Sequence, residues 1–164
     1  MQNLNYGVIG NCSTAALISE KGAIEWLCFP EFDSPSVFAA ILDRQKGGHF
    51  GFKVTSDYKV TQSYVPHTNI LSTHFESEEG AFDVVDFMPC YPTSDGKDFY
   101  RPAEIYRYIR WAKGRPRMKV DYRPAPNYAR GKTIYNVTSQ YVETYSSVEN
   151  KDRQYLYSSL DLKK

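Results

Sequence analysis

An all-β fold, an antiparallel, supersandwich-like β-sandwich with one short helix, is the architecture that the sequence predicts. Three observations support this fold class. Apolar and polar residues alternate with a period of two along most of the chain, as in strands that have one buried face. Aromatic residues, which favour pleated surfaces, make up 15% of the sequence, and they include 14 tyrosines. Turns that contain glycine or proline separate the alternating segments at short intervals.

The first half of the chain contains the strongest strand signals. Two hairpins are predicted there, one from residues 15–19 and 23–29 and one from residues 70–75 and 81–87. Further strands are expected over residues 50–54 and 58–64. In the first hairpin the face shared by Ile24, Trp26 and Cys28 is expected to be buried, with Trp26 as its anchor in the core.

One segment of this half predicts a helix. Ser34 is suited to cap it, and Pro35 fits its first turn, where a missing N–H group is no loss. The apolar residues that follow are spaced by three and four positions: Val37, Phe38, Ile41 and Leu42.

The second half has weaker signals. Residues 106–111 and 117–122 flank a glycine-proline break and predict a third hairpin, and residues 89–102 predict a long loop. Short strands are also expected over residues 133–137, 140–144 and 154–158. All 164 residues are predicted to form a single domain, residues 1–164, which could be incomplete at its C-terminus because the last strand has no closing neighbour.

Composition excludes several classes of protein. The 20 basic and 19 acidic residues leave a formal charge of +1, which gives no field to hold a nucleic acid. No apolar run is long enough to cross a membrane, and the N-terminus lacks the features of a signal peptide. Cys12, Cys28 and Cys90 fit neither a disulfide framework nor a zinc site, so we expect buried thiols in the cytoplasm.

Three stretches of the sequence, in this order, resemble one known family. They are "YGVIGNCSTAALISEKGAIEWLCFPEFDSPSVFAAILD", "YVPHTNILSTHFESEEGAFDVVDFMP" and "YRYIRWAKGRPRMKVDYRPAPNYARGK". Together they resemble the N-terminal region of bacterial and archaeal glycoside hydrolase family 15 proteins, which include glucoamylase-, glucodextranase- and trehalase-like enzymes. The likeness covers about residues 6–132, and it implies the β-sandwich that the strand pattern also predicts.

The resemblance also implies a division of labour. In the full-length proteins of this family an (α/α)6 barrel with two catalytic glutamates follows the sandwich. The chain would then be a non-catalytic accessory domain that braces and helps complete the barrel, which acts on α-glucosidic substrates such as starch fragments, dextran or trehalose. Two alternatives are a free-standing carbohydrate-binding module that uses exposed aromatics, and a structural domain that self-associates into a homo-oligomer through an open sheet edge. None of these three functional hypotheses requires a cofactor.

The residues themselves give little sign of catalysis. Inverting hydrolysis of a glycoside needs two carboxyl groups about 6.5–9.5 Å apart, one of them with a raised pKa. Glu78 and Glu79 are expected in a solvated turn, and Asp86 is expected to be a structural carboxylate. The three histidines are scattered, which predicts neither a metal site nor a catalytic triad. The remaining acidic candidates are Asp33, Glu76 and Asp83.

Two surfaces are candidates for contact with a sugar or with the barrel. The first is the corner that follows the first hairpin, together with the turn around residues 10–12. We expect five of its residues to cluster on one exposed side and to shape the mouth of the barrel: Asn11, Trp26, Phe32, Asp33 and Ser34. The second is the basic and aromatic segment "DYRPAPNYARGKT", in which Arg123, Tyr128 and Arg130 could contact a sugar or the partner domain. Purely structural roles also explain both segments, the first as a strand-to-helix corner and the second as an ordered surface loop, and they are the favoured interpretation.

Overall fold

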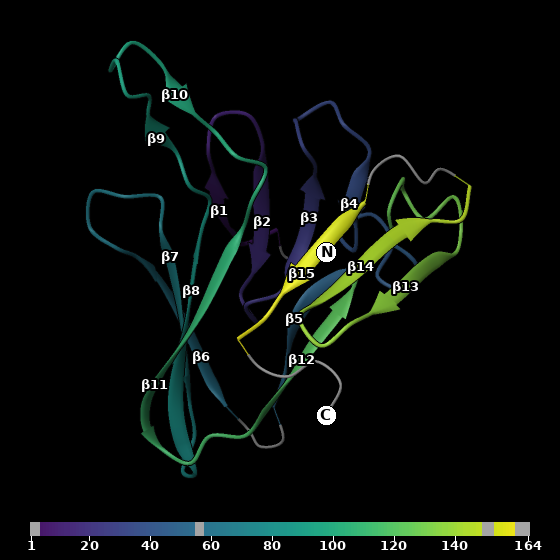
Figure 1. Ribbon diagram of the computed structural model, residues 1–164. Helices are drawn as coiled ribbons and strands as arrows, with labels where there is room; N and C mark the ends of the chain where they lie inside the picture. The colour runs from purple at the N-terminus through teal and green to yellow at the C-terminus, as the bar shows by residue number, and fades with distance from the viewer. Residues whose placement is uncertain (1–3, 55–57, 149–152, 160–164) are drawn as a thin grey trace.

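The computed structural model describes residues 4–54, 58–148 and 153–159, and its strands form two facing antiparallel sheets with a smaller sheet beside them (Figure 1). The first sheet has the order β1-β2-β3-β5-β12, with β4 beside β3. Its strands are β1 (Tyr6–Gly10), β2 (Ala15–Ser19), β3 (Ile24–Cys28), β4 (Ser36–Phe38), β5 (His49–Val54) and β12 (Met118–Arg123).

The second sheet has the order β11-β8-β7-β6. Its strands are β6 (Lys59–Tyr64), β7 (Leu71–Glu76), β8 (Gly80–Phe87) and β11 (Tyr106–Gly114). A two-stranded ribbon and a three-stranded sheet complete the fold: β9 (Tyr91–Pro92) with β10 (Phe99–Tyr100), and β13 (Thr133–Val137), β14 (Tyr141–Ser146) and β15 (Gln154–Tyr157).

The core lies between the two larger sheets and consists of two apolar clusters. The first cluster joins strands of both sheets: Ile9, Ala16, Ile18, Ile24, Leu27, Val37, Phe38, Leu71 and Met88. The second contains Phe75, Phe82 and Val84, with Phe52 and Val54 of the first sheet packed against it. The rings of Phe75 and Phe82 are parallel, with centroids 4.6 Å apart. Alternating burial on two facing sheets confirms the predicted β-sandwich.

A buried ion pair connects the sheets. Arg107 of β11 donates to both carboxylate oxygens of Asp86 on β8, at 2.8 and 3.1 Å. The same guanidinium donates to the backbone carbonyls of Gly22 and Phe50 in the first sheet. Its Cζ atom also lies 4.7 Å from the Phe50 ring centroid. Asp86 therefore has the structural role expected for it, because its partner joins the two layers.

The predicted helix after Ser34 is not formed in the described residues, and this part of the prediction is wrong. Residues 36–38 are strand β4, which pairs with β3 through Leu27↔Phe38 and Cys28↔Ser36. All side chains from 36 to 40 are buried, so the segment lacks the polar face that a helix in this position would present to solvent. A turn follows, in which the Asp43 carboxylate accepts from the backbone N–H groups of Gln45 and Lys46.

The first hairpin forms as predicted, but Trp26 is not its core anchor. The register between β2 and β3 shifts by one residue at Glu25: Leu17 pairs with Trp26, and Ile18 pairs with Ile24. This β-bulge moves Leu27 to the buried face and leaves Trp26 half-buried on the other side.

The third predicted hairpin is also wrong, although both of its strands exist. Strand β11 pairs with β8 in the second sheet, whereas β12 pairs with β5 in the first. Each strand finds its partners inside a different sheet, as the packing of Tyr122 on Phe50 shows, with ring centroids 5.2 Å apart. The chain therefore crosses from one layer to the other between Gly114 and Met118.

The C-terminal strand signals and the thiol prediction have mixed outcomes. Strands β13, β14 and β15 form as expected, and among the residues that the structure describes β15 pairs only with β14. Cys28 is buried as predicted, but Cys12 and Cys90 are exposed because they lie in connections outside the sheets. In the part of the chain that the structure covers, no helix has the length and apolar character needed to span a membrane.

Candidate functional site

Four connections gather at one end of the sandwich, which we call the loop end: residues 11–14, 29–35, 65–70 and 89–105. In Figure 1 the β1–β2 turn, the β3–β4 connection and the β9–β10 ribbon project at the top. Side-chain and backbone hydrogen bonds join these connections. The Asn69 side chain donates to the carbonyl of Gly10 at 2.6 Å, and the backbone N–H of Phe32 donates to the carbonyl of Ser13 at 3.0 Å.

Asn11 is the internal support of the loop end. Its Oδ1 atom accepts from the backbone N–H groups of Ser13 and Thr14, both at 3.1 Å, and its Nδ2 atom donates to the carbonyl of Pro102 at 2.9 Å. Only 2% of Asn11 is exposed. An amide can fill this position because it both accepts and donates, whereas an ionised carboxylate only accepts.

The corner after β3 presents an aromatic side chain between two acidic ones. The ring of Phe32 is 63% exposed, and Glu31 and Asp33 beside it are exposed too. A tight turn holds the corner, because the Oγ atom of Ser34 accepts from the backbone N–H of Glu31 at 3.0 Å. An exposed ring on a hydrogen-bonded turn is suited to contact another surface.

The β9–β10 ribbon adds further exposed aromatic rings to the loop end. Tyr91 and Tyr100 face each other across the ribbon, and Arg101 lies 5.8 Å from the ring centroid of Phe99. At least half of each of the three rings is exposed. Sequence reasoning treated this segment as a loop and missed these residues; the aromatic residues on both sides of its Ser-Asp-Gly turn were the available signal.

The residues predicted for the corner are divided by the structure. Phe32, Asp33 and Ser34 lie at the loop end, and Asn11 lies beneath them rather than on the exposed side. Trp26 instead packs against Tyr128, with ring centroids 6.4 Å apart.

The second predicted segment places Tyr128 in an unusual turn. Three consecutive residues, Asn127, Tyr128 and Ala129, have positive φ angles of 55°, 54° and 56°. This left-handed conformation is strained for residues with a side chain, and each costs of the order of 1 kcal/mol. Two hydrogen bonds to Ser36 hold the turn, one from the backbone N–H of Asn127 to its carbonyl and one from that of Tyr128 to its Oγ atom.

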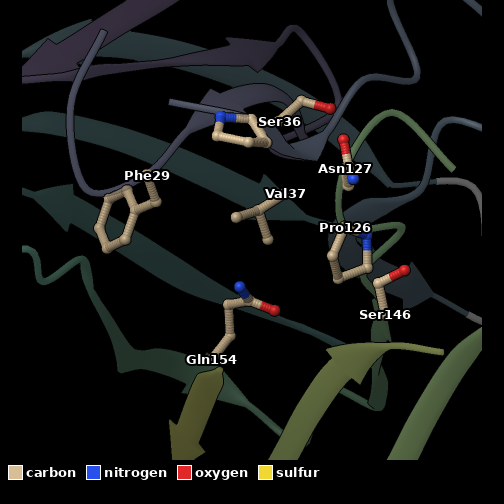
Figure 2. A pocket seen from close by; sticks show the side chains of 8 residues that line it. Phe29, Ser36, Val37, Pro126, Asn127, Ser146 and Gln154 are labelled. Atoms are coloured by element: carbon tan, nitrogen blue, oxygen red, sulfur yellow. The ribbon is translucent and has the colours of Figure 1, made fainter. Parts of the chain in front are cut away.

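The two arginines predicted beside Tyr128 have different surroundings. Arg123 lies on β12 and donates to Asp121 at 2.7 Å, so it belongs to the outer face of the first sheet. Arg130 follows the left-handed turn and is exposed. A shallow crevice beside this turn is lined by Phe29, Val37, Pro126 and Gln154 among others, and it has room for about one water molecule (Figure 2).

The carboxyl groups are set up to stay ionised. Burial raises the pKa of Asp83, but hydrogen bonds from His74 and Arg110 outweigh it and hold the pKa below its usual value. Burial acts in the same direction on Asp121, yet the cations around it lower the pKa of that carboxyl to about 2. Every described carboxyl group with a clear pKa shift is lowered: Asp43, Glu76, Asp83, Asp95, Asp121 and Glu143.

These electrostatics fit ion pairs rather than proton transfer. A general acid in glycoside hydrolysis needs a raised pKa, and the shifts seen in this chain have the opposite sign. Within residues 4–54, 58–148 and 153–159, no three metal-binding side chains come together.

Comparison with known proteins finds several relatives that are named trehalase. A trehalase of Thermoplasma volcanium is 36% identical over 132 residues, which are 79% of this chain and 20% of the relative. Trehalase 1 of Sulfolobus acidocaldarius is 51% identical over 85 residues, or 51% of this chain and 14% of the relative. A trehalase of Mycolicibacterium smegmatis is 33% identical over 141 residues, or 77% of this chain and 20% of the relative.

The chain thus spans a fifth or less of the length of these relatives. No solved structure gives a significant match. A family model described as "Trehalase-like, N-terminal" matches residues 5–150, which is most of the chain and includes all of the loop end. Together with the β-sandwich, this match confirms the resemblance found in the sequence. The chain belongs to the trehalase-like N-terminal domain family.

Proposed function

We propose that the chain is the non-catalytic N-terminal domain of a glycoside hydrolase, whose loop end packs against the catalytic domain and helps to complete its substrate site. The observation that carries the proposal is the coverage of the relatives. Proteins named trehalase contain a matching domain in at most a fifth of their length, which leaves the greater part for catalysis. The lowered carboxyl pKa values support the same division, because a general acid is better placed elsewhere.

The loop end is the best candidate for the contact with the catalytic domain. Its exposed rings lie on a hydrogen-bonded turn and on the paired β9–β10 ribbon, so little conformational entropy is lost when another surface covers them. Phe32 would fill an apolar contact, and Glu31 and Asp33 would accept hydrogen bonds from a partner or from sugar hydroxyl groups. The catalytic partner would be an (α/α)6 barrel that acts on an α-glucosidic substrate such as trehalose. Exposed free thiols on Cys12 and Cys90 fit a reducing compartment such as the cytoplasm.

A second candidate function is carbohydrate binding by the isolated domain. It is favoured by three tyrosines on β14 and β15, which form a continuous group of rings. Tyr155 and Tyr157 are inclined by only 28° with centroids 6.4 Å apart, although Tyr141 is tilted by 72° and 53° to them. Sugar rings stack on aromatic side chains that are exposed in this way.

A chimera tests the first function. The matched region of the Thermoplasma volcanium relative is replaced by this chain, and trehalose hydrolysis is measured. We expect activity in the chimera, and about a tenfold lower kcat/KM when Phe32→Ser is added, because the contact at the substrate site is lost. The matched control is Tyr108→Ser, which removes an equally exposed ring from the outer face of the second sheet, outside the loop end, and should leave kcat/KM unchanged.

Calorimetric titration of the isolated chain separates the two candidates. Trehalose, maltooligosaccharides and isomaltooligosaccharides are titrated into the chain, and glucose release is followed in parallel. No binding and no release fit the accessory function, whereas saturable binding that Tyr157→Ser abolishes would favour the carbohydrate-binding function. Glucose release by the isolated chain would contradict both.

A further inference from the structure

Strands β11 and β12 follow each other in the chain but form the edges of opposite sheets. β11 pairs only with β8, and β12 only with β5, so the outward backbone groups of both have no strand partner among the described residues. In Figure 1 the two strands diverge from the turn that joins them at the bottom of the molecule. We call this edge of the sandwich, residues 106–123, the β11–β12 flank.

Inward-facing side chains of β11 become progressively exposed along the strand. Arg107, Ile109 and Trp111 lie opposite buried residues of β8 and therefore share the inner face of the sheet. The side chain of Arg107 is only 4% exposed, Ile109 is 37% exposed, and Trp111 is 67% exposed. The inner face of β11 is thus covered near Tyr106 and uncovered near Gly114, although the residues of β8 and β7 beside it stay buried.

Strand β12 of the first sheet also has an inward-facing side chain that is exposed. Val120 of β12 lies opposite Phe52, which packs against the core, yet Val120 is 46% exposed. Trp111 is also fixed in place, because its Nε1–H group donates to the carbonyl of Gly114 at 3.1 Å. Ile109 and Trp111 therefore form an uncovered apolar strip on the inner face of β11, and Val120 is a separate exposed apolar residue on β12.

Positive charge surrounds this strip. Residues 106–120 contain six basic residues and no acidic residue, although the whole chain has a formal charge of only +1. Three of the six, Arg107, Arg110 and Lys113, form ion pairs with carboxylates of the second sheet. The other three are exposed and form no ion pair with any residue that the structure describes: Arg115, Arg117 and Lys119.

We propose that the β11–β12 flank is the docking site of an extended polypeptide segment in which apolar and acidic side chains alternate. The segment adds to the free edge of β11, so its backbone satisfies the unpaired N–H and C=O groups. Its apolar side chains, on one face, cover Ile109 and Trp111. Its acidic side chains meet the exposed cations of the connection that follows β11, Arg115 and Arg117.

The chemistry of the flank favours a polypeptide over a polyanion. A free strand edge supplies main-chain hydrogen bonds at every second residue, which a polysaccharide or nucleic acid does not match in register. Three unpaired cations in a chain with a formal charge of +1 give too weak a field to hold a polyanion at physiological salt. The exposed apolar and basic residues of the flank lie at the other end of β11 from the loop end, and the proposal stands or falls independently of the proposed function.

The first test uses a synthetic peptide. An acetylated, fluorescein-labelled nonapeptide that alternates valine and glutamate is titrated into the chain and followed by fluorescence anisotropy, with a valine-lysine nonapeptide as the control. We expect saturable binding of the glutamate peptide that weakens as salt is raised, and binding at least tenfold weaker for the lysine peptide. Equal binding of both peptides, or none at millimolar concentration, would overturn the proposal.

Hydrogen exchange locates the peptide. Saturation with the glutamate peptide should slow exchange of backbone amides in residues 106–114 by at least tenfold, which strand pairing does and a diffuse electrostatic contact does not. Binding of the peptide without this protection would refute strand addition. If heparin also competes with the unprotecting peptide, the flank is a polyanion site instead.

Two variants and a matched control complete the test. The charge reversal R115E/R117E/K119E should weaken peptide binding at least tenfold, and Trp111→Ala should weaken it independently. The control reversal K21E/R44E/K46E changes the net charge by the same amount at exposed positions of the first sheet and its connections, and it should leave binding within twofold. A loss of equal size in the control would overturn the proposal.

Discussion

Strand β8 carries one buried aspartate on each of its faces, and the two have very different surroundings. Asp86 points into the sandwich, where its side chain is fully buried and the side chain of Arg107 is only 4% exposed. Asp83 points outward and binds His74 and Arg110, of which Arg110 is 60% exposed. Both carboxylates are ion-paired, but only the inner pair also binds the backbone of the other sheet.

This comparison shows how the setting of an ion pair determines its contribution. A charge inside the sandwich has no access to water, so removal of one partner leaves an uncompensated buried charge. Solvent screens the outer network, so each of its members is replaceable at a small cost. The inner pair should therefore determine whether the layers stay together, and the outer network should adjust stability and its dependence on pH and salt.

The largest expected effect is that of Arg107→Leu. It leaves Asp86 buried without a partner and removes donors from the carbonyls of Gly22 and Phe50. We expect a loss of about 3–5 kcal/mol in the free energy of unfolding, measured by urea denaturation. The double variant with Asp86→Leu should recover at least half of the loss, because no charge remains buried. A loss below about 1 kcal/mol in the free energy of unfolding of Arg107→Leu would mean that the inner ion pair contributes no more to stability than the outer network.

A smaller effect is expected from Asp83→Asn on the outer face. The amide keeps the shape of the side chain but weakens the charge-assisted bonds to His74 and Arg110. The expected loss is roughly 1 kcal/mol, and Arg110→Ala should lose less because that side chain is largely exposed. Addition of 1 M salt should reduce the effect of Asp83→Asn and leave that of Arg107→Leu unchanged. Equal salt sensitivity of both variants would contradict the comparison.

A third effect appears only in acid and concerns the outer face of the first sheet. Hydrogen bonds from Arg123, Lys53 and His49 hold the pKa of Asp121 at about 2 in the folded chain, below the ordinary 3.8, despite partial burial that raises it. The folded pKa is depressed, so the stabilisation is complete above pH 4 and is lost as the pH falls from about 4 to 2. Asp121→Asn should flatten the fall in melting temperature over this range. An unchanged slope would show that Asp121 contributes nothing to acid unfolding.

The smallest effect is expected from Tyr108→Ser. Tyr108 lies on the same outer face as Asp83 and Arg110 but is 63% exposed and forms no part of the ion-pair network. The free energy of unfolding should change by less than about 0.5 kcal/mol. A loss above about 1 kcal/mol in urea denaturation would show that the outer face contributes more packing energy than its exposure indicates.

The sequence by itself determined where most strands form, although it did not predict β1 or the β9–β10 ribbon and predicted a helix where β4 lies. The alternation of apolar and polar residues is a local property, so it located both N-terminal hairpins and the strands of the small C-terminal sheet. The acidic, proline-flanked corner after the first hairpin predicted Phe32 and Asp33 on an exposed side, and both are exposed. The resemblance to a hydrolase family could likewise be found in the sequence, because short motifs in a fixed order can be recognised without knowing which contacts they make.

Only the tertiary structure decided which strands pair and which way the ambiguous side chains face. The period of two is the same whether β12 pairs with β11 or with β5, and burial against partners distant in sequence settled the choice. A single inserted residue at Glu25 turned Trp26 away from the core, and alternation cannot show such a bulge in advance. The pairing of Asp86 with Arg107 and the uncovered flank beside it depend on how two sheets face each other, a non-local arrangement that no local pattern encodes.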